Sequence, residues 1–128
     1  MTYRIAALAA IAAIAAAAPA RAQEHGAAPA GRQVTITGTV VDVSCFVGSG
    51  ATGATHRQCA QVCADAGLPL AILGEDGNVY LPLASAPGQG QNARLRANAE
   101  QRVRVTGEVI EAHGVRGIKI ASVSPAQT

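Results

Sequence analysis

Two segments of this chain carry the same strand pattern with a glycine at its centre. Residues 34–42 read VTITGTVVD, and residues 103–111 read VRVTGEVIE. In both segments apolar and polar residues alternate up to a Thr-Gly pair, and two adjacent apolar residues follow it. Alternation predicts half-buried β-strands, and a central glycine is typical of a bulge or a sharp bend. The pattern therefore favours a strongly coiled sheet in which these two strands bend at their glycines.

Turn-forming residues delimit the other strands. The first strand is predicted to continue to Val43, and the fourth covers 103–109. The sequence EDGN at 75–78 contains Asp-Gly, a strong hairpin signal, and it separates two short apolar runs. These runs predict strands at 71–73 and 79–83. His113 and Gly114 form a second turn, after which a fifth strand is expected at 115–123.

Two helices are expected between these strands. Thr55 and Gln58 fit a capping box, and Gly67 followed by Leu68 fits a helix terminator, so the sequence predicts a helix over 56–66. A weaker helical pattern covers 92–100. Five coiled strands with a helix between the third and the fourth is the chain order of an OB-fold. We therefore expect a mainly β protein: a five-stranded OB-like barrel, with a capped helix inserted between strands 1 and 2 and a short helix before strand 4.

The amino-terminal residues have the features of a secretory signal peptide. Arg4 precedes an apolar run at 5–18, and small residues around Ala22 fit a cleavage site. The run is shorter than the roughly twenty residues of a membrane span, so we expect no stable membrane anchor and a periplasmic or secreted protein. The predicted organisation is a signal peptide at 1–22, a flexible leader at 23–31, an OB-like domain at 32–124 and a tail at 125–128.

Charge and aromatic content argue against nucleic-acid binding. The chain has ten basic and eight acidic residues, and cleavage would remove two of the basic ones, Arg4 and Arg21. The mature chain would then be neutral and would lack the basic patch that attracts phosphates. Only Phe46 and Tyr80 would remain to stack on bases. We therefore expect no nucleic-acid partner.

The chemistry of the chain is concentrated in four residues: Cys45, His56, Cys59 and Cys63. They include all three cysteines of the chain. On a helix, His56, Cys59 and Cys63 share one face. Cys59 and Cys63 are one turn apart, which suits two ligands of one metal ion, whereas their Cβ atoms would be too far apart for a disulfide. Cys45 is expected at the end of the first strand.

Three interpretations of this cluster remain open. A disulfide between Cys45 and either Cys59 or Cys63 would attach the inserted helix to the barrel, as suits an oxidising compartment. Alternatively, the three thiolates bind zinc or copper, with His56 as a fourth member. His56 lies two helical turns, about 10 Å, from Cys63, so its participation would require a distorted first turn. The third interpretation, redox chemistry by a spare thiol, is the weakest, because the chain has no Cys-x-x-Cys pair.

The motif also supports a family resemblance. Residues 38–46 (GTVVDVSCF), 56–63 (HRQCAQVC), 67–69 (GLP) and 77–80 (GNVY) make the chain resemble small exported bacterial OB-like domains. These domains carry a Cys-aromatic pair at a strand end and a His-x-x-Cys-Ala-x-x-Cys helix. The resemblance covers most of the mature chain. It implies the barrel fold and the four-residue cluster, and it implies no particular activity.

Other candidate sites are weaker. Residues 48–53 (GSGATG) match a dinucleotide-binding glycine pattern, but the predicted helix begins too late and a second nucleotide-binding half has no room. We therefore expect a flexible, solvated loop at 47–54. Asp42 could orient His56. No arrangement of residues indicates catalysis, so we expect a non-catalytic domain that binds a metal ion or, as a disulfide-stapled adaptor, a periplasmic protein. The oligomeric state is not set by the sequence.

Overall fold

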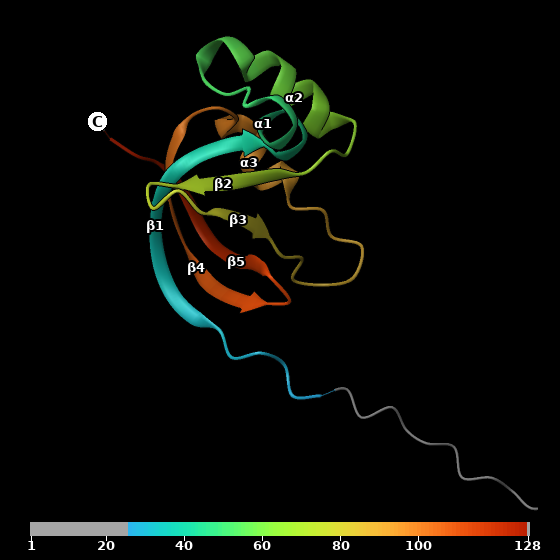
Figure 1. Cartoon of the computed structure of the whole chain (residues 1–128), viewed down its shortest axis with the longest axis vertical. Coiled ribbons are helices and arrows are strands. Elements are labelled where there is room, and N and C mark those ends of the chain that lie inside the picture. Colours follow the sequence, from blue (N-terminus) through green and yellow to red (C-terminus); the bar gives the residue numbers. More distant parts are fainter. Residues whose placement is uncertain (1–25, 128) are drawn as a thin grey trace, which may run out of the picture.

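The chain folds into a closed five-stranded β-barrel. The structure is a computed structural model that describes residues 26–127 (Figure 1). The strands follow one another around the barrel in the order β1-β2-β3-β5-β4, and β4 pairs with β1 to close it. The strands are β1 (Arg32–Asp42), β2 (Leu70–Gly74), β3 (Val79–Pro82), β4 (Arg102–Ala112) and β5 (Val115–Pro125). Only the β3–β5 pairing is parallel among these. The predicted mainly β, OB-like barrel is confirmed.

Gly38 and Gly107 lie at the centres of β1 and β4, the two strands that share the repeated pattern. A Cβ atom on Gly38 would collide with the carbonyl of Leu73, and one on Gly107 would collide with the carbonyl of Lys119. The β4–β5 register also shifts between Thr106 and Gly107. Neighbouring backbone therefore approaches both glycines too closely for any side chain, as the shared Thr-Gly pattern predicts.

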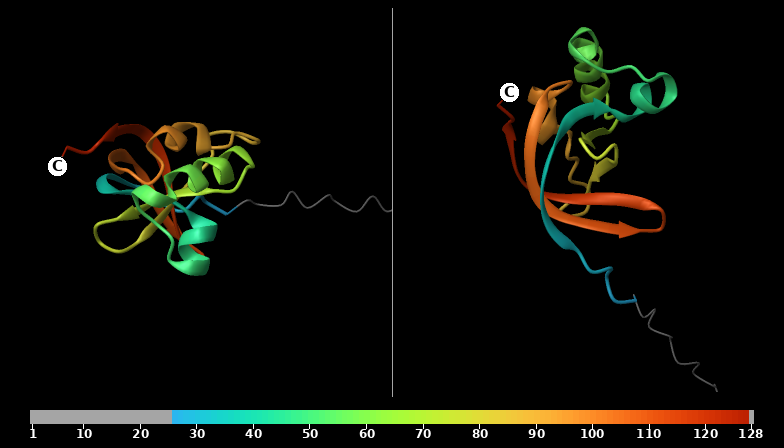
Figure 2. Two further views of the ribbon diagram at one scale, coloured as in Figure 1. Left: turned by 90° about the horizontal axis from the view of Figure 1, so that it is seen from above. Right: turned by 60° about the vertical axis from the view of Figure 1, so that its left-hand side comes forward.

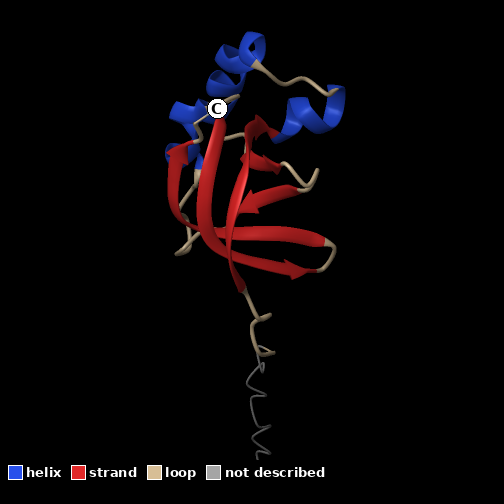
Figure 3. Ribbon diagram, turned by 90° about the vertical axis from the view of Figure 1, so that its left-hand side faces the viewer, coloured by secondary structure: helices blue, strands red, loops and turns tan. Residues whose placement is uncertain are grey.

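The helices gather at one end of the barrel, away from the β4–β5 turn (Figures 2 and 3). The helical elements are α1 (Val43–Ser49), the 3₁₀ turn η1 (Ala54–His56), α2 (Arg57–Asp65), α3 (Asn92–Leu95) and the 3₁₀ turn η2 (Arg96–Asn98). The first three lie between β1 and β2, and the last two precede β4. The predicted positions of the inserted helix and of the short helix are therefore both correct.

Aliphatic side chains fill the barrel interior. The buried cluster consists of Val40, Ala64, Leu70, Ile72, Tyr80, Leu95, Val103, Val105, Val109, Ile118 and Ile120. Leu95 of α3 and Ala64 of α2 belong to this cluster, so both helices pack against the barrel end. Because α2 contributes only small buried residues, Ala60 and Ala64, it approaches the barrel closely. Its placement then depends on polar contacts as well as on apolar ones.

One helix was not predicted. The expected solvated loop at 47–54 is wrong in its first part, because 43–49 form α1. Asp42 caps the start of this helix: its Oδ1 accepts hydrogen bonds from the amides of Ser44, at 2.8 Å, and Cys45, at 3.2 Å. Gly50, with φ of 72°, ends α1, and its amide donates a hydrogen bond to the Phe46 carbonyl.

The predicted capping box of α2 is also wrong, whereas the predicted terminator is confirmed. Thr55 lies inside η1, and α2 begins after His56 without a side-chain cap. At the other end, Gly67 has φ of 91°, and the amide of Leu68 bonds to the carbonyl of Cys63 at 2.9 Å. This 6→1 bond is the one that a left-handed glycine permits after a helix.

The predicted signal peptide at 1–22 lies outside the described residues, as do the first positions of the predicted leader. Within 26–127, none of the helices has both the length and the apolar character that a membrane crossing requires.

Candidate metal centre

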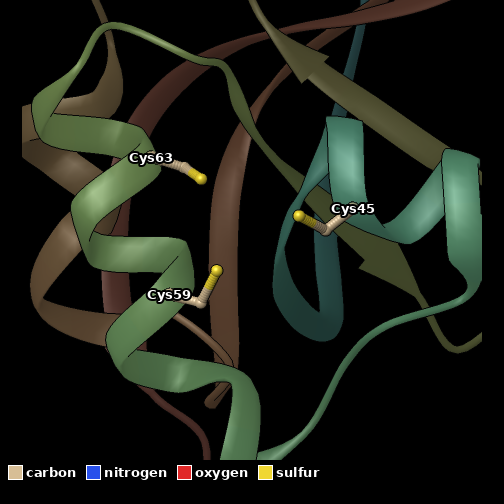
Figure 4. Close-up of side chains that lie close together, drawn as sticks. All are labelled: Cys45, Cys59 and Cys63. Atoms are coloured by element: carbon tan, nitrogen blue, oxygen red, sulfur yellow. The ribbon is translucent and has the colours of Figure 1, made fainter.

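Three thiols from two helices meet beside the barrel end. The Sγ atoms of Cys45, Cys59 and Cys63 all lie within 4.8 Å of one another. Figure 4 shows Cys45 pointing from α1 toward the two cysteines of α2, which stand one turn apart. All three thiols are free. Residues that are 18 positions apart in the sequence are thus gathered into one group, as the sequence predicts for the cysteines.

The position of Cys45 is set by the end of β1. Asp42 is the last residue of β1, pairs with Leu70 of β2, and caps α1. Cys45 therefore lies in the first turn of a helix that continues directly from the barrel wall. The expectation that Cys45 would end the strand is wrong, because the Asp42 cap converts the strand into a helix before that residue.

The position of α2 is set by the segment before β4. Asn92 Nδ2 donates to the carbonyls of Ala64 and Leu68, at 3.1 and 2.7 Å, while its Oδ1 accepts from the Leu70 amide at 3.1 Å. Arg96 forms a two-bond ion pair with Asp65. Contacts at both ends of its last turn therefore hold α2, and with it Cys63, against α3 and η2.

The first turn of α2 is held in the same way. Arg57 Nη2 donates to the carbonyl of Ala97 at 2.7 Å, and Gln61 Nε2 donates to that of Arg96 at 3.3 Å. Cys59 lies between these two anchored residues. The segment 92–98 thus acts as a support along the length of α2.

Asp42 forms the inner wall of the thiol group. The residue is fully buried, and its Oδ2 has no hydrogen-bond partner among the described residues. Burial opposes ionisation of this carboxyl, but the Cys63 thiol and the amides of Cys45 and Ser44 outweigh it, so the pKa of Asp42 is lowered. A buried carboxylate with a free oxygen therefore lies beside two of the three thiols.

Burial and this carboxylate both favour the protonated form of the adjacent thiols. The contact of Asp42 with the Cys63 thiol, together with burial, raises the pKa of Cys63 to about 12. Burial and then the charge of Asp42 raise the pKa of Cys45 as well. A bound cation would instead favour deprotonation of the thiols, because it attracts both the thiolates and the carboxylate.

The structure places His56 outside this three-thiol group. Its Nδ1 lies 3.0 Å from Oε1 of Glu100, and the side chain of His56 is mostly buried. The other carboxylate oxygen of Glu100 accepts from Thr52 Oγ1 at 2.7 Å and from the Gly53 amide at 2.8 Å. Both carboxylate oxygens of Glu100 therefore bind groups of the segment that joins α1 to α2.

Glu100 is the supporting residue near the site that the sequence did not reveal. It has φ of 57°, which is rare for a residue with a side chain, and its own amide bonds to the Val40 carbonyl at 2.8 Å. Asp42, which the sequence suggested as the partner of His56, contacts the thiols instead. Neither the unusual backbone of Glu100 nor its tertiary contacts have a local sequence signal.

The arrangement can hold a soft metal ion. A tetrahedral or trigonal ion with metal–sulfur bonds of about 2.3 Å separates its sulfur ligands by about 3.8 to 4 Å. The sulfur atoms all lie within 4.8 Å of one another, which is at most about 1 Å above this separation. Among residues 26–127, no His, Asp or Glu joins the group as a fourth ligand.

The chain matches no protein-family model, no curated protein and no solved structure at a significant level. What the structure establishes is a class: a closed OB-like barrel with a helical insertion that gathers three free thiols.

Proposed function

We propose that this protein is an exported, non-catalytic binding domain that holds a soft metal ion through Cys45, Cys59 and Cys63. The observation that carries the proposal is the meeting of three Sγ atoms within 4.8 Å, contributed by two separately anchored helices. Packing alone gives no reason for every cysteine of the chain to meet at one point. The expected family resemblance and the predicted secretory signal agree with this proposal.

Of the two metals that suit such thiols, copper(I) fits the described ligands better than zinc. Structural zinc almost always has four ligands, whereas this group offers three. Copper(I) is selected by thiolates and is satisfied by three of them. His56 does not belong to the group, so it would have to move closer to the thiols to become a fourth ligand for zinc. We therefore propose copper(I) as the principal ligand and zinc as the weaker one.

The test is metal stoichiometry and affinity in the full-length mature protein. The reduced protein should bind one copper(I) in native mass spectrometry, and competition with a copper(I) chelator should give its affinity. Cys45→Ser, Cys59→Ser and Cys63→Ser should each weaken binding by at least about ten-fold, since removing even the outer partners of ligands typically costs that much. Gln58→Ser, an exposed change next to Cys59 on the same helix, is the matched control and should leave affinity unchanged.

The second candidate is a disulfide-stapled adaptor that binds a periplasmic protein. Cys45 faces both Cys59 and Cys63, so one disulfide would join α1 to α2 and leave one thiol free. In that case the protein purified from the periplasm would contain one alkylatable cysteine and no metal. Only one of the two α2 cysteines would then matter for stability, whereas a metal site needs both. A full set of three alkylatable thiols and no copper binding would contradict both candidates.

A further inference from the structure

The three thiols differ in their access to solvent. Cys59 is exposed, whereas Cys45 and Cys63 are partly buried. The residue before Cys59, Gln58, is exposed, and so are Val62 one turn later on α2 and Thr55 in the preceding turn η1, whereas the following residue, Ala60, is buried. The group therefore has one exposed cysteine, Cys59, and two partly buried ones, Cys45 and Cys63.

The opposite side of the group is closed. Asp42 lies beside Cys45 and Cys63, is fully buried, and belongs to the strand pairing of the barrel. A large ligand cannot reach the thiols from that side. Of the three thiols, that of Cys59 is the most open to an incoming metal complex.

We propose that Cys59 is the receiving thiol of the site, which takes copper(I) by ligand exchange from a donor that carries the ion on thiolates. This inference rests on the proposed function and adds the route and the chemistry of the donor. The donor must itself use thiolates, because free copper(I) is scarce wherever thiols are present and a thiolate-bound ion can pass between sulfurs through a shared intermediate.

The exchange balances without an oxidant or reductant. A bond forms between the sulfur of Cys59 and the metal, and one bond between the metal and a donor thiolate breaks. The proton of the Cys59 thiol passes to the departing donor sulfur, and copper stays in its +1 state. The same exchange then occurs at Cys45 and Cys63, which displaces the remaining donor ligands and leaves the ion bound by three thiolates.

Transfer kinetics test this order. Reduced protein is mixed with the copper(I)–glutathione complex in a stopped-flow instrument, and the copper–thiolate absorbance is followed. Cys59→Ser should slow the first phase by at least about ten-fold. Cys45→Ser and Cys63→Ser should keep the wild-type first phase and lose copper faster to a chelator. Gln58→Ser is again the control.

The outcomes separate the inference from the proposed function. If wild-type protein retains no copper at equilibrium, the proposed function fails. If it retains copper but Cys63→Ser slows the first phase as much as Cys59→Ser does, only the receiving role of Cys59 is overturned.

A second experiment identifies the source of the copper. The measurement is repeated with a copper(I)-loaded protein that has two cysteine ligands. A faster first phase than with glutathione assigns the source to a carrier protein, and a slower one assigns it to small thiols.

A measurement on the unmodified protein guards against variants that fold poorly. Limited alkylation of the reduced wild-type protein, followed by peptide mass spectrometry, should label Cys59 before Cys45 and Cys63. Equal labelling rates at the three thiols would contradict the ordered access on which the inference depends.

Discussion

Nδ1 of His56 lies 3.0 Å from Oε1 of Glu100, and this contact ties the segment before α2 to the residues that lead into β4. The two residues are 44 positions apart in the chain. The same carboxylate also holds Thr52 and Gly53. Glu100 therefore contributes to the relative placement of α1 and α2, together with the Asp42 cap and the contacts between α2 and residues 92–98.

Replacing Glu100 should destabilise the protein and loosen the thiol site. Glu100→Ala leaves the Gly53 amide, the Thr52 hydroxyl and the His56 ring without their acceptor, and should cost about 2–4 kcal/mol in the free energy of unfolding. Glu100→Gln keeps one acceptor oxygen and should cost less. Urea denaturation followed by circular dichroism measures both.

Glu111→Ala is the control for Glu100→Ala. Glu111 is a largely exposed acid that pairs with Arg116. Loss of such a surface ion pair should change stability by about 0–1 kcal/mol. Equal losses for the two variants would show that the contacts of Glu100 add nothing beyond an ordinary ion pair.

Asp42→Asn should make Cys63 more acidic. Asparagine still caps α1 but carries no charge, so the pKa of Cys63 should fall from about 12 toward its usual value of 9.0. Thiolate absorbance measured against pH, in the metal-free Cys45→Ser/Cys59→Ser background with and without Asp42→Asn, isolates this thiol. An unchanged titration would show that the carboxylate does not act on Cys63.

The same contact gives a pH dependence with a definite sign. Because the folded protein holds the proton of Cys63 more tightly than the unfolded chain does, the contact stabilises the protein fully below about pH 9. That contribution is lost as the pH rises toward about 12. The difference in the free energy of unfolding between the proteins with and without Asp42→Asn should therefore shrink between about pH 9 and pH 12. Urea denaturation at several pH values measures it.

Tyr80→Phe should raise the pKa of Asp76. The Tyr80 hydroxyl donates to Oδ2 of Asp76 at 2.6 Å, and this bond, followed by those from Asn78, holds the pKa of Asp76 at about 2. The stabilisation is therefore present above about pH 3.8 and lost as the pH falls through about 2. Carboxyl chemical shifts give the pKa directly, and the stability deficit of Tyr80→Phe seen at neutral pH should disappear near pH 2.

Gly38→Ala should destabilise the barrel. Its Cβ would collide with the Leu73 carbonyl, which belongs to paired backbone and cannot rotate away. We expect a loss of about 1–3 kcal/mol, as for other overpacked sites. Gly48→Ala is the control, because a Cβ there meets nothing within 4 Å and alanine favours the helix. A neutral Gly38→Ala variant would mean that the strand bend does not require glycine.

Local patterns predicted the barrel because its strands are locally encoded. Alternation, the two Thr-Gly bends and the Asp76-Gly77 turn each act within a few residues, and the order of strands and helices then leaves few topologies. The cysteines were equally apparent, since the chain has only three. Tertiary packing was needed only to bring Cys45 to α2.

The rest of the site depended on contacts that sequence patterns do not record. Gly48 and Gly50 made the α1 segment resemble a loop, although Asp42 and Gly50 supplied a cap at each end of a helix. Thr55 resembled a helix cap, but Glu100 holds the segment just before it from a distant part of the chain. A buried acid acts on whichever segment folds against it, and no local spacing signals that contact.

Asp42 and Leu70 face each other on neighbouring strands, so the chain leaves the barrel and returns to it at a single rung of the β1–β2 ladder. Residues 43–69, which lie between them, form an excursion from the barrel that begins and ends at this pair. Insertions or deletions within that excursion can change the reach of the thiols without shifting any strand by a residue. The barrel can thus stay constant while the segment that carries the thiols varies in length and sequence.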